Sequence, residues 1–331
     1  MRDFAFARAD STASAVEAAS VDRAALLAGG TELLNWFRLG ITAPDRVVDI
    51  GGLDELRGIE QQASELRIGA LATLNEIGEH PLVVGRAGAL ASACLQAASA
   101  QLRNRATIGG NVLQRTRCAY FRAEEPVPWP CNKRAPGSGC AALAGRHERH
   151  AIFGWTEDCV AVQPSDPAVA LAALDAQVDV IGPAGPRSIP MREFHLTPHE
   201  AGDPTTETRL APDELIVGYR IPTEVRDGQA YLKIRERASY EYAIVSAAAT
   251  VVVAGGEIVT ARVALGSVAQ RPWRLTAAET ELSGAPLTRE ALQPIIERGT
   301  SDAVPLPHNG FKVAMARNAA VRALLTAGGA R

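Results

Sequence analysis

The chain has 331 residues, of which 47% are hydrophobic and 21% are charged. This balance is typical of a globular protein, and the length favours two or three domains over one. The formal net charge of −3 at pH 7 argues against binding to nucleic acid or to an anionic membrane surface, because both attract strongly basic chains. No apolar run reaches the roughly 18 residues of a transmembrane helix, so we expect no membrane insertion.

The first 111 residues predict two α/β regions. Residues 1–60 predict helices over Ser11–Ser20 and Glu32–Leu39, and strands over Ala25–Ala28 and Val47–Ile50. Residues 61 to about 111 predict a strand and two helices, over Glu65–Ile68, Leu74–Glu79 and Arg86–Ala98.

Residues 112 to about 163 show no helical or strand periodicity and are rich in Pro, Gly and Arg. An irregular segment of this length is uncommon inside a compact domain, so we expect a bound group to order it. Beyond this segment, the sequence predicts a helix, a strand, a run of turns and a second strand, over Asp166–Leu174, Val178–Ile181, Pro183–Pro190 and Glu214–Ile221.

The remaining residues predict a separate α+β block beginning near residue 224. Antiparallel strands are expected over Tyr231–Arg235, Ala243–Ala254 and Glu257–Leu265, with a turn at Gly255-Gly256. Helices are expected over Leu275–Leu282, Arg289–Glu297 and Lys312–Leu325.

Two glycine pairs stand where a ligand could be held. Gly29-Gly30 separates a predicted strand from a helix, and Gly109-Gly110 lies in a strand-to-turn segment, Thr107–Asn111. Without a Cβ atom, the backbone at such a turn can approach a phosphate closely. Each turn alone is weak evidence, and neither fits the Gly-x-Gly-x-x-Gly pattern of a dinucleotide fold. Together they suggest one extended ligand, such as a dinucleotide, held from both sides.

Several segments, in this order, resemble the xanthine dehydrogenase family. They are AGGTELL at 28–34, TIGGN at 107–111, Pro164-Ser165-Asp166, and Lys233 within YLKIRERASYEYAIVSAA. The resemblance covers essentially the whole chain and implies the FAD-binding subunit of a molybdenum hydroxylase. It implies an α+β fold: a two-part FAD-binding domain of the vanillyl-alcohol-oxidase-like type, and a C-terminal domain of the CO dehydrogenase flavoprotein type. The implied domains are 1–60, 61–223 with an insertion at about 112–163, and 224–331.

The resemblance also implies which residues contact FAD. The first turn would wrap the pyrophosphate through Leu26, Leu27, Ala28, Gly29, Gly30, Thr31, Glu32, Leu33 and Leu34. The second would complete the FAD site through Thr107, Ile108, Gly109, Gly110 and Asn111, with further contacts from Asp166, Ile216 and Lys233. On the residues alone, Asp166 fits equally well as a helix N-terminal residue and Lys233 as an exposed strand residue.

Four of the five cysteines, Cys118, Cys131, Cys140 and Cys159, lie within the insertion at Cys-x12-Cys-x8-Cys-x18-Cys. Four thiolates are the ligand set of a [4Fe-4S] cluster, and the wide intervals differ from the tight Cys-x2–4-Cys pairs of structural zinc sites. Zinc, two disulfides and four free thiols remain alternatives at this point. Cys94, within an Ala-rich helix, is expected to be a buried and inert thiol.

The insertion resembles that of the FAD subunit of bacterial periplasmic aldehyde oxidoreductases, which implies a [4Fe-4S] cluster here. The FAD subunit of 4-hydroxybenzoyl-CoA reductase also has an inserted cluster, but with different cysteine intervals. By this resemblance the chain passes electrons through FAD to an external acceptor and has no catalytic side chain. Its partners would be a molybdenum-cofactor large subunit and a [2Fe-2S] small subunit.

Two other functions are compatible with the residues: another molybdenum hydroxylase, including a xanthine dehydrogenase, or a flavin oxidase that acts alone. A zinc-containing binding module is a third possibility. Residues 1–6 do not resemble a secretory signal, which leaves the cytoplasm, or the periplasm by export with a signal-bearing partner.

Overall fold

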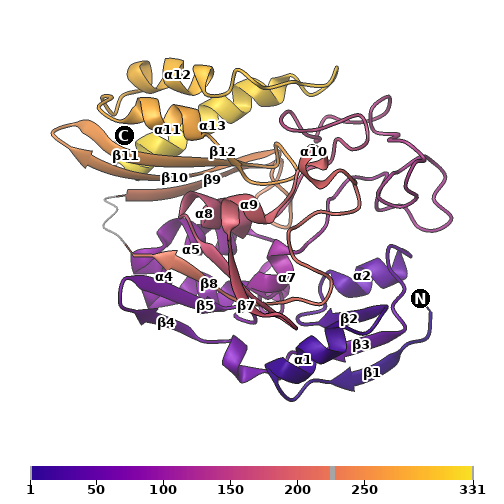
Figure 1. Ribbon diagram of the computed structural model, residues 1–331. Helices are drawn as coiled ribbons and strands as arrows, with labels where there is room; N and C mark the ends of the chain where they lie inside the picture. The colour runs from indigo at the N-terminus through magenta and orange to yellow at the C-terminus, as the bar shows by residue number, and fades with distance from the viewer. Residues whose placement is uncertain (1, 224–227, 330–331) are drawn as a thin grey trace.

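The structure is a computed structural model that describes residues 2–223 and 228–329. The described residues form three sheets with helices packed around them (Figure 1). The expected start of the C-terminal domain at residue 224 falls outside the described residues. Among the residues described, no helix combines the length and apolar character needed to cross a membrane.

The N-terminal sheet is parallel, with the order β1-β3-β2. Its strands are β1 (Ala5–Arg8), β2 (Ala24–Leu27) and β3 (Arg46–Asp49), and the helices α1 (Thr12–Ala19) and α2 (Leu33–Arg38) connect them. The predicted helices and two of the strands are confirmed. Strand β1 was not predicted, because its four residues are all exposed and show no apolar alternation.

The middle sheet is antiparallel, with the order β4-β5-β8-β6-β7. Its strands are β4 (Ile59–Gln62), β5 (Glu65–Gly69), β6 (Gln177–Gly182), β7 (Gly185–Pro190) and β8 (Leu215–Pro222), and the short 3-10 helix η1 (Asp54–Leu56) precedes β4. The turns expected over Pro183–Pro190 are wrong, because most of this segment forms β7. Proline is tolerated there because β7 is an edge strand, where a missing N–H breaks no ladder bond.

The middle region also contains eight short helices within the described residues. They are α3 (Leu74–Glu79), α4 (Pro81–Arg86), α5 (Gly88–Gln96), α6 (Ala100–Arg103), α7 (Ile108–Val112), α8 (Asp166–Ala173), α9 (Met191–Phe194) and α10 (Pro198–Ala201). Three of them, α4, α7 and α9, contact this sheet. The strand-to-turn interpretation of Thr107–Asn111 is wrong. Thr107 is the N-cap of α7, and its hydroxyl accepts a hydrogen bond from the Gly110 N–H at 3.3 Å, as N-cap threonines commonly do.

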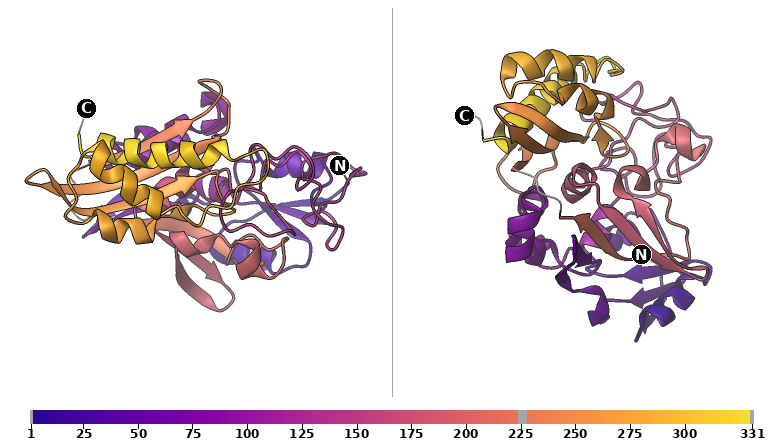
Figure 2. Two further views of the ribbon diagram at one scale, coloured as in Figure 1. Left: turned by 90° about the horizontal axis from the view of Figure 1, so that it is seen from above. Right: turned by 60° about the vertical axis from the view of Figure 1, so that its left-hand side comes forward.

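The C-terminal sheet is antiparallel with the order β12-β11-β10-β9. It contains β9 (Gly228–Ile234), β10 (Val245–Ala254), β11 (Glu257–Gly266) and β12 (Trp273–Arg274), followed by α11 (Thr276–Leu282), α12 (Arg289–Arg298) and α13 (Phe311–Ala327). These helices, at the yellow end of the colour scale, lie over one face of the sheet (Figure 2).

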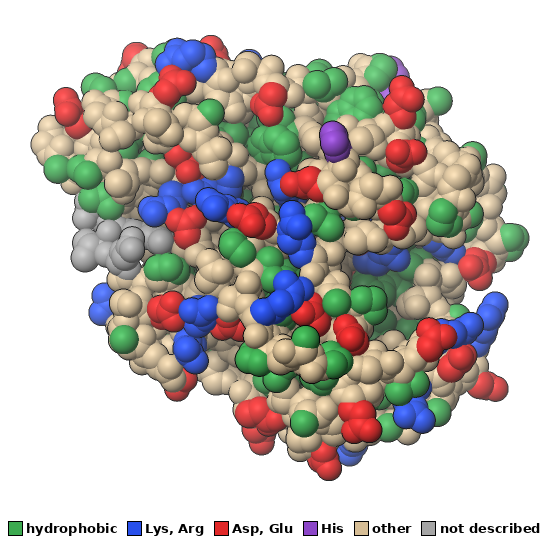
Figure 3. All heavy atoms as spheres, viewed as in Figure 1, with side chains coloured by type: hydrophobic (Ala, Val, Ile, Leu, Met, Phe, Trp, Pro, Cys, Tyr) green, Lys and Arg blue, Asp and Glu red, His purple; other side chains and the backbone are tan. Residues whose placement is uncertain are grey.

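Both faces of the C-terminal sheet are covered, since α13 packs on β10 and β9 while α5 and α8 pack against the same strands. Seven consecutive residues of β10, from 245 to 251, are therefore buried; a strand covered on one face only would alternate. Ion pairs from Arg262 and Arg274 to Asp175 join this sheet to the end of α8. Charged side chains gather across the middle of the face shown in Figure 3.

The insertion, residues 112–163, contains no helix or strand beyond the last residue of α7. It forms loops that lie between α2 and the C-terminal part of the chain (Figure 1). Backbone hydrogen bonds fix it to the C-terminal part, from the N–H groups of Ile152 and Phe153 to Val268 O and from the Val304 N–H to Ile152 O. The expected irregular segment is thus confirmed.

Candidate functional site

The Gly29-Gly30 turn lies against the backbone just before α7, the helix that carries the second glycine pair. A Cβ atom on Gly29 would stand 1.9 Å from the carbonyl oxygen of Arg105, two residues before the Thr107–Asn111 segment. Gly30 has φ +73°, the left-handed region that favours glycine. The Gly109 N–H donates to Ala70 O at 3.0 Å. The close approach of Gly29 to Arg105 therefore brings together the two segments expected to hold one ligand.

Asp166 and Lys233 lie near α7, which carries the second glycine pair, and form an ion pair with each other. Lys233 Nζ lies 2.7 Å from Asp166 Oδ2, and the two side chains are 0% and 5% exposed. Tyr231 donates its hydroxyl hydrogen to the other carboxylate oxygen. Burial raises the pKa of Asp166, and the charge of Lys233 opposes that shift. The interpretation of Lys233 as an exposed strand residue is therefore wrong.

Asp166 also opens α8, whose N-cap is the preceding Ser165. The Ser165 hydroxyl donates to Asn111 Oδ1 at 2.7 Å, and this bond links α8 to the second glycine turn. Helix initiation and ion pairing thus both involve this short segment. Of the other expected FAD contacts, Ile216 is buried within β8 and Leu34 is 47% exposed on α2; their contacts with FAD remain predictions.

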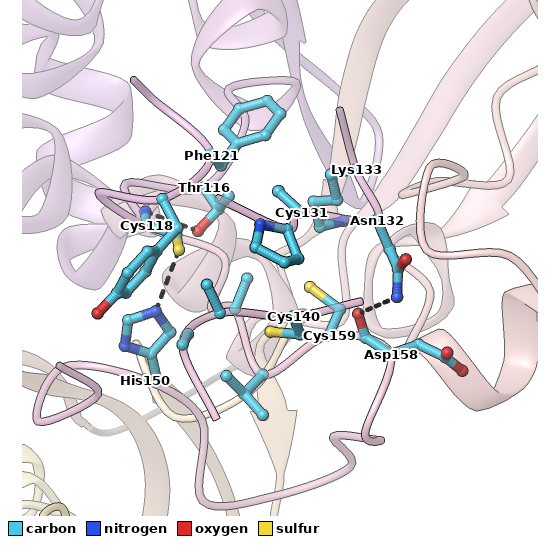
Figure 4. Close-up of a pocket in the computed structure, with 16 residues that line it drawn as sticks. Thr116, Cys118, Phe121, Cys131, Asn132, Lys133, Cys140, His150, Asp158 and Cys159 are labelled. Carbon is cyan, nitrogen blue, oxygen red and sulfur yellow. Dashed lines mark hydrogen bonds between the residues drawn. The ribbon is translucent and has the colours of Figure 1, made fainter. Parts of the chain in front are cut away.

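The four cysteines of the insertion line one cavity, together with Thr116, Phe121, Asn132, Lys133, His150 and Asp158 (Figure 4). All four are free thiols, so the two-disulfide alternative has no support in the structure. Cys131 and Cys140 face each other across an isolated β-bridge. The sulfur of Cys118 points toward His150 (Figure 4).

Burial disfavours the thiolate forms of these cysteines unless a bound cation compensates their charge. Burial raises the pKa of Cys118 to about 12, while backbone N–H groups of Phe121 and Tyr120 favour its thiolate. Burial likewise raises the pKa of Cys159 to about 11, against the Lys133 charge and the Ala161 N–H. Buried thiolates need a compensating cation, and the irons of a cluster supply it. The donor set therefore fits an iron–sulfur cluster.

Within residues 2–223 and 228–329, no group of three or more His, Cys, Asp and Glu side chains is arranged to hold one ion. A zinc ion needs four ligands at one point, whereas a cube binds one thiolate at each iron.

Two residues near this site, His150 and Glu207, were not singled out from the sequence as functional. His150 Nε2 lies 3.2 Å from Cys118 Sγ. Lys133, with a side chain 2% exposed, forms an ion pair with Glu207 at 2.7 Å. Neither residue stands in a recognisable motif, and Glu207 is more than seventy positions from Lys133. Only the folded chain brings them to the cysteines.

Two family models match this chain, one over its N-terminal two thirds and one over the remainder. Residues 2–224 match the FAD binding domain in molybdopterin dehydrogenase, and residues 230–327 match the CO dehydrogenase flavoprotein C-terminal domain. The chain is 41% identical over 319 residues to the aldehyde oxidoreductase FAD-binding subunit PaoB of Escherichia coli K12, a match that covers 96% of each chain. It is 28% identical to the carbon monoxide dehydrogenase medium chain of Hydrogenophaga pseudoflava, over 91% of this chain and 88% of that one.

The fold agrees with these matches. A solved structure of the Hydrogenophaga pseudoflava carbon monoxide dehydrogenase superposes with a TM-score of 0.77 at 27% identity, covering 99% of this chain and 98% of that one. Two domain matches that together span almost the whole chain agree with this superposition. The chain therefore belongs to the FAD-binding medium subunits of the xanthine dehydrogenase and carbon monoxide dehydrogenase family.

Proposed function

We propose that this chain is the electron-transfer subunit of a molybdenum-dependent aldehyde oxidoreductase. The observation that carries the proposal is its 41% identity, over 96% of its length, to an aldehyde oxidoreductase FAD-binding subunit. We propose as partners a molybdenum-cofactor large subunit, a [2Fe-2S] small subunit and an external electron acceptor. Bound FAD supplies the redox chemistry, since a flavin exchanges electrons singly with iron–sulfur centres and in pairs with other acceptors.

The residues of this chain bind and orient FAD and do no chemistry on the aldehyde. We propose that the turn from Leu26 to Leu34 holds the pyrophosphate and that Thr107–Asn111 holds the cofactor from the other side. The direct packing of Gly29 against the backbone of Arg105 supports one binding site for both turns. Asp166, Ile216 and Lys233 complete the proposed set. We also retain the division into domains 1–60, 61–223 and 224–331 as a proposal.

We further propose that Cys118, Cys131, Cys140 and Cys159 bind a [4Fe-4S] cluster. Support comes from four free thiols around one cavity. Burial raises the pKa of Cys118, Cys131 and Cys159, and backbone N–H groups act in the opposite direction at each of them. Hydrogen bonds to the sulfurs are a common feature of cluster sites and help to set the reduction potential. His150, at Cys118, would contribute such a bond from its ring nitrogen.

The ultraviolet–visible spectrum of the anaerobically purified chain, with iron and acid-labile sulfide assayed on the same sample, tests both cofactors. We expect flavin bands over a broad cluster absorbance, with about four irons and four sulfides per chain. A flavin spectrum without iron or sulfide would remove the cluster from the proposal and leave the FAD subunit. Absence of flavin, even after FAD is added, would contradict the proposed function itself.

Co-purification tests the proposed partners. The chain, expressed with the genes that flank its own, should copurify with a large subunit that contains molybdenum and a small subunit that contains iron. The complex should oxidise aldehydes with an added electron acceptor, and the isolated chain should not. Aldehyde oxidation by the isolated chain would instead favour a flavin oxidase that acts alone.

A further inference from the structure

Helix α2 begins within the proposed FAD site and contacts the insertion that carries the four cysteines. It begins directly after the Gly29-Gly30 turn and ends at Arg38. Its N-cap residue, Glu32, makes no side-chain cap hydrogen bond to the helix backbone. The Glu32 carboxylate instead accepts a hydrogen bond from Trp36 Nε1 at 2.7 Å, and its other partners come from the insertion.

Two arginines of the insertion hold the first end of α2. Arg117 Nη1 lies 2.8 Å from Glu32 Oε2, and Arg122 Nη1 lies 2.7 Å from Glu32 Oε1. The three side chains are only 15% to 21% exposed, so solvent screens these charges less than those of a surface ion pair. The guanidinium of Arg117 also stacks 4.5 Å from the ring of Tyr242.

A third arginine holds the other end of α2. Arg134, with a side chain 6% exposed, donates to the carbonyl oxygens of Leu39 and Gly40 at 3.2 and 3.4 Å. Its other Nη donates within the insertion to Phe121 O and Ala123 O, both at 2.9 Å. Carbonyls at a helix C-terminus have no partner inside the helix, and Arg134 supplies one here.

Two of these arginines are attached by backbone hydrogen bonds to cysteines of the candidate cluster site. The Arg122 N–H donates to Cys118 O at 3.0 Å, and the Arg134 N–H donates to Cys131 O at 2.9 Å. Arg117 directly precedes Cys118. The insertion has no helix or strand after α7 within the described residues. The positions of these arginines therefore depend on whatever fixes the cysteines.

We propose that the four-cysteine site and the FAD site bind their cofactors cooperatively, and that α2 couples the two sites. Cluster binding fixes Cys118 and Cys131, the arginines then hold both ends of α2, and α2 fixes the turn that receives the pyrophosphate. Arg117, Arg122 and Arg134 are positioning residues that act through α2. This inference rests on the proposed function, because it takes the cysteines as cluster ligands and the turn as an FAD contact.

Binding of FAD to the full chain, freed of flavin, tests the proposal with the cluster present and after its removal by chelation. Coupling free energies between sites are typically equivalent to about 5- to 150-fold in affinity, and we expect the FAD dissociation constant to rise by a factor in this range when the cluster is removed. Because coupling of binding free energies is reciprocal, bound FAD should also raise the chelator concentration needed to remove half of the iron at equilibrium.

The Arg134→Met variant separates this coupling from general stability. It retains all four cysteines, so it should bind iron and sulfide as the wild type does. It should bind FAD more weakly with the cluster present, and cluster removal should then weaken FAD binding less than in the wild type. Arg146→Met, which changes an exposed arginine of the same insertion, is the matched control and should behave as the wild type. If the cluster-free chain unfolds, FAD binding by the cluster-containing Arg134→Met variant still tests the proposal.

The outcomes distinguish this inference from the proposed function. A chain that contains iron and sulfide, yet binds FAD equally well with and without the cluster, overturns the coupling and leaves the function intact. The coupling through α2 is likewise overturned if Arg134→Met shows the full wild-type effect of cluster removal. A chain that binds FAD but contains no iron or sulfide removes the proposed cluster, which the metal assay reports independently, and the coupling is rejected with it.

Discussion

Replacement of Asp166 by Asn tests the buried ion pair beside the second glycine turn. One carboxylate oxygen receives the Lys233 ammonium at 2.7 Å, and the other receives the Tyr231 hydroxyl. An amide of the same shape has only one acceptor atom, so its NH2 group would face a donor. The variant would also leave the Lys233 charge, whose side chain is 0% exposed, without its counter-charge.

The burial of this ion pair sets the expected loss in the free energy of unfolding. Removal of one partner from a buried ion pair costs about 3–5 kcal/mol, because the remaining charge stays buried and uncompensated. The exposed pair Arg23–Asp45 has a similar separation of 3.0 Å, but its side chains are 49% and 71% exposed. Such pairs contribute about 0–1 kcal/mol. Asp166→Asn should therefore lower the free energy of unfolding several times more than Asp45→Asn does.

Urea unfolding of FAD-free protein, followed by circular dichroism, measures this difference without any contribution from the proposed flavin contacts. The double variant Asp166→Leu/Lys233→Met removes both charges and should recover most of the loss, since a buried pair can often be replaced by apolar residues at little cost. Equal losses for Asp166→Asn and Asp45→Asn would contradict this account of the pair, as would a double variant no more stable than Asp166→Asn.

Three further predictions concern pH, backbone contact and metal content. Burial lowers the pKa of His195 to about 4 in the folded protein. In the unfolded chain this imidazole takes up a proton below its ordinary pKa of about 6.5, so the free energy of unfolding should fall as pH drops from about 6.5 to 4. A His195→Gln variant should show a flatter urea midpoint against pH, and an identical profile would rule out this role for His195. Gly29→Ala places a Cβ 1.9 Å from a backbone oxygen and should abolish FAD retention, whereas Gly52→Ala, with no atom within 4 Å, should retain the FAD bound to the purified protein. Cys159→Ser should lose most of the iron found by colorimetric assay, while Cys94→Ala should keep it; equal iron contents would remove Cys159 from the ligand set.

Local patterns in the sequence were enough to predict the family, most of the secondary structure and the grouping of the four cysteines. Apolar periodicity is a local property, so it located α2, α3, α8 and the long C-terminal strands within a few residues. Glycine pairs and cysteine intervals can also be recognised along the chain. Two of the errors occurred where local signals are weak: β1 is exposed throughout, and β7 is an edge strand that contains proline. A third concerned Thr107–Asn111, where the glycine pair concealed the short helix α7.

Which charges meet is a property of the tertiary fold alone. Glu32 and Arg122 are 90 positions apart, and Asp166 and Lys233 are separated by 67. Contacts of this kind depend on the packing of whole elements and leave no periodic trace in the sequence. The same reason explains why the position of His150 at Cys118, 32 residues away, was not foreseen. The contacts of Arg117, Arg122 and Arg134 with α2 are equally distant in sequence, so only the folded chain reveals them.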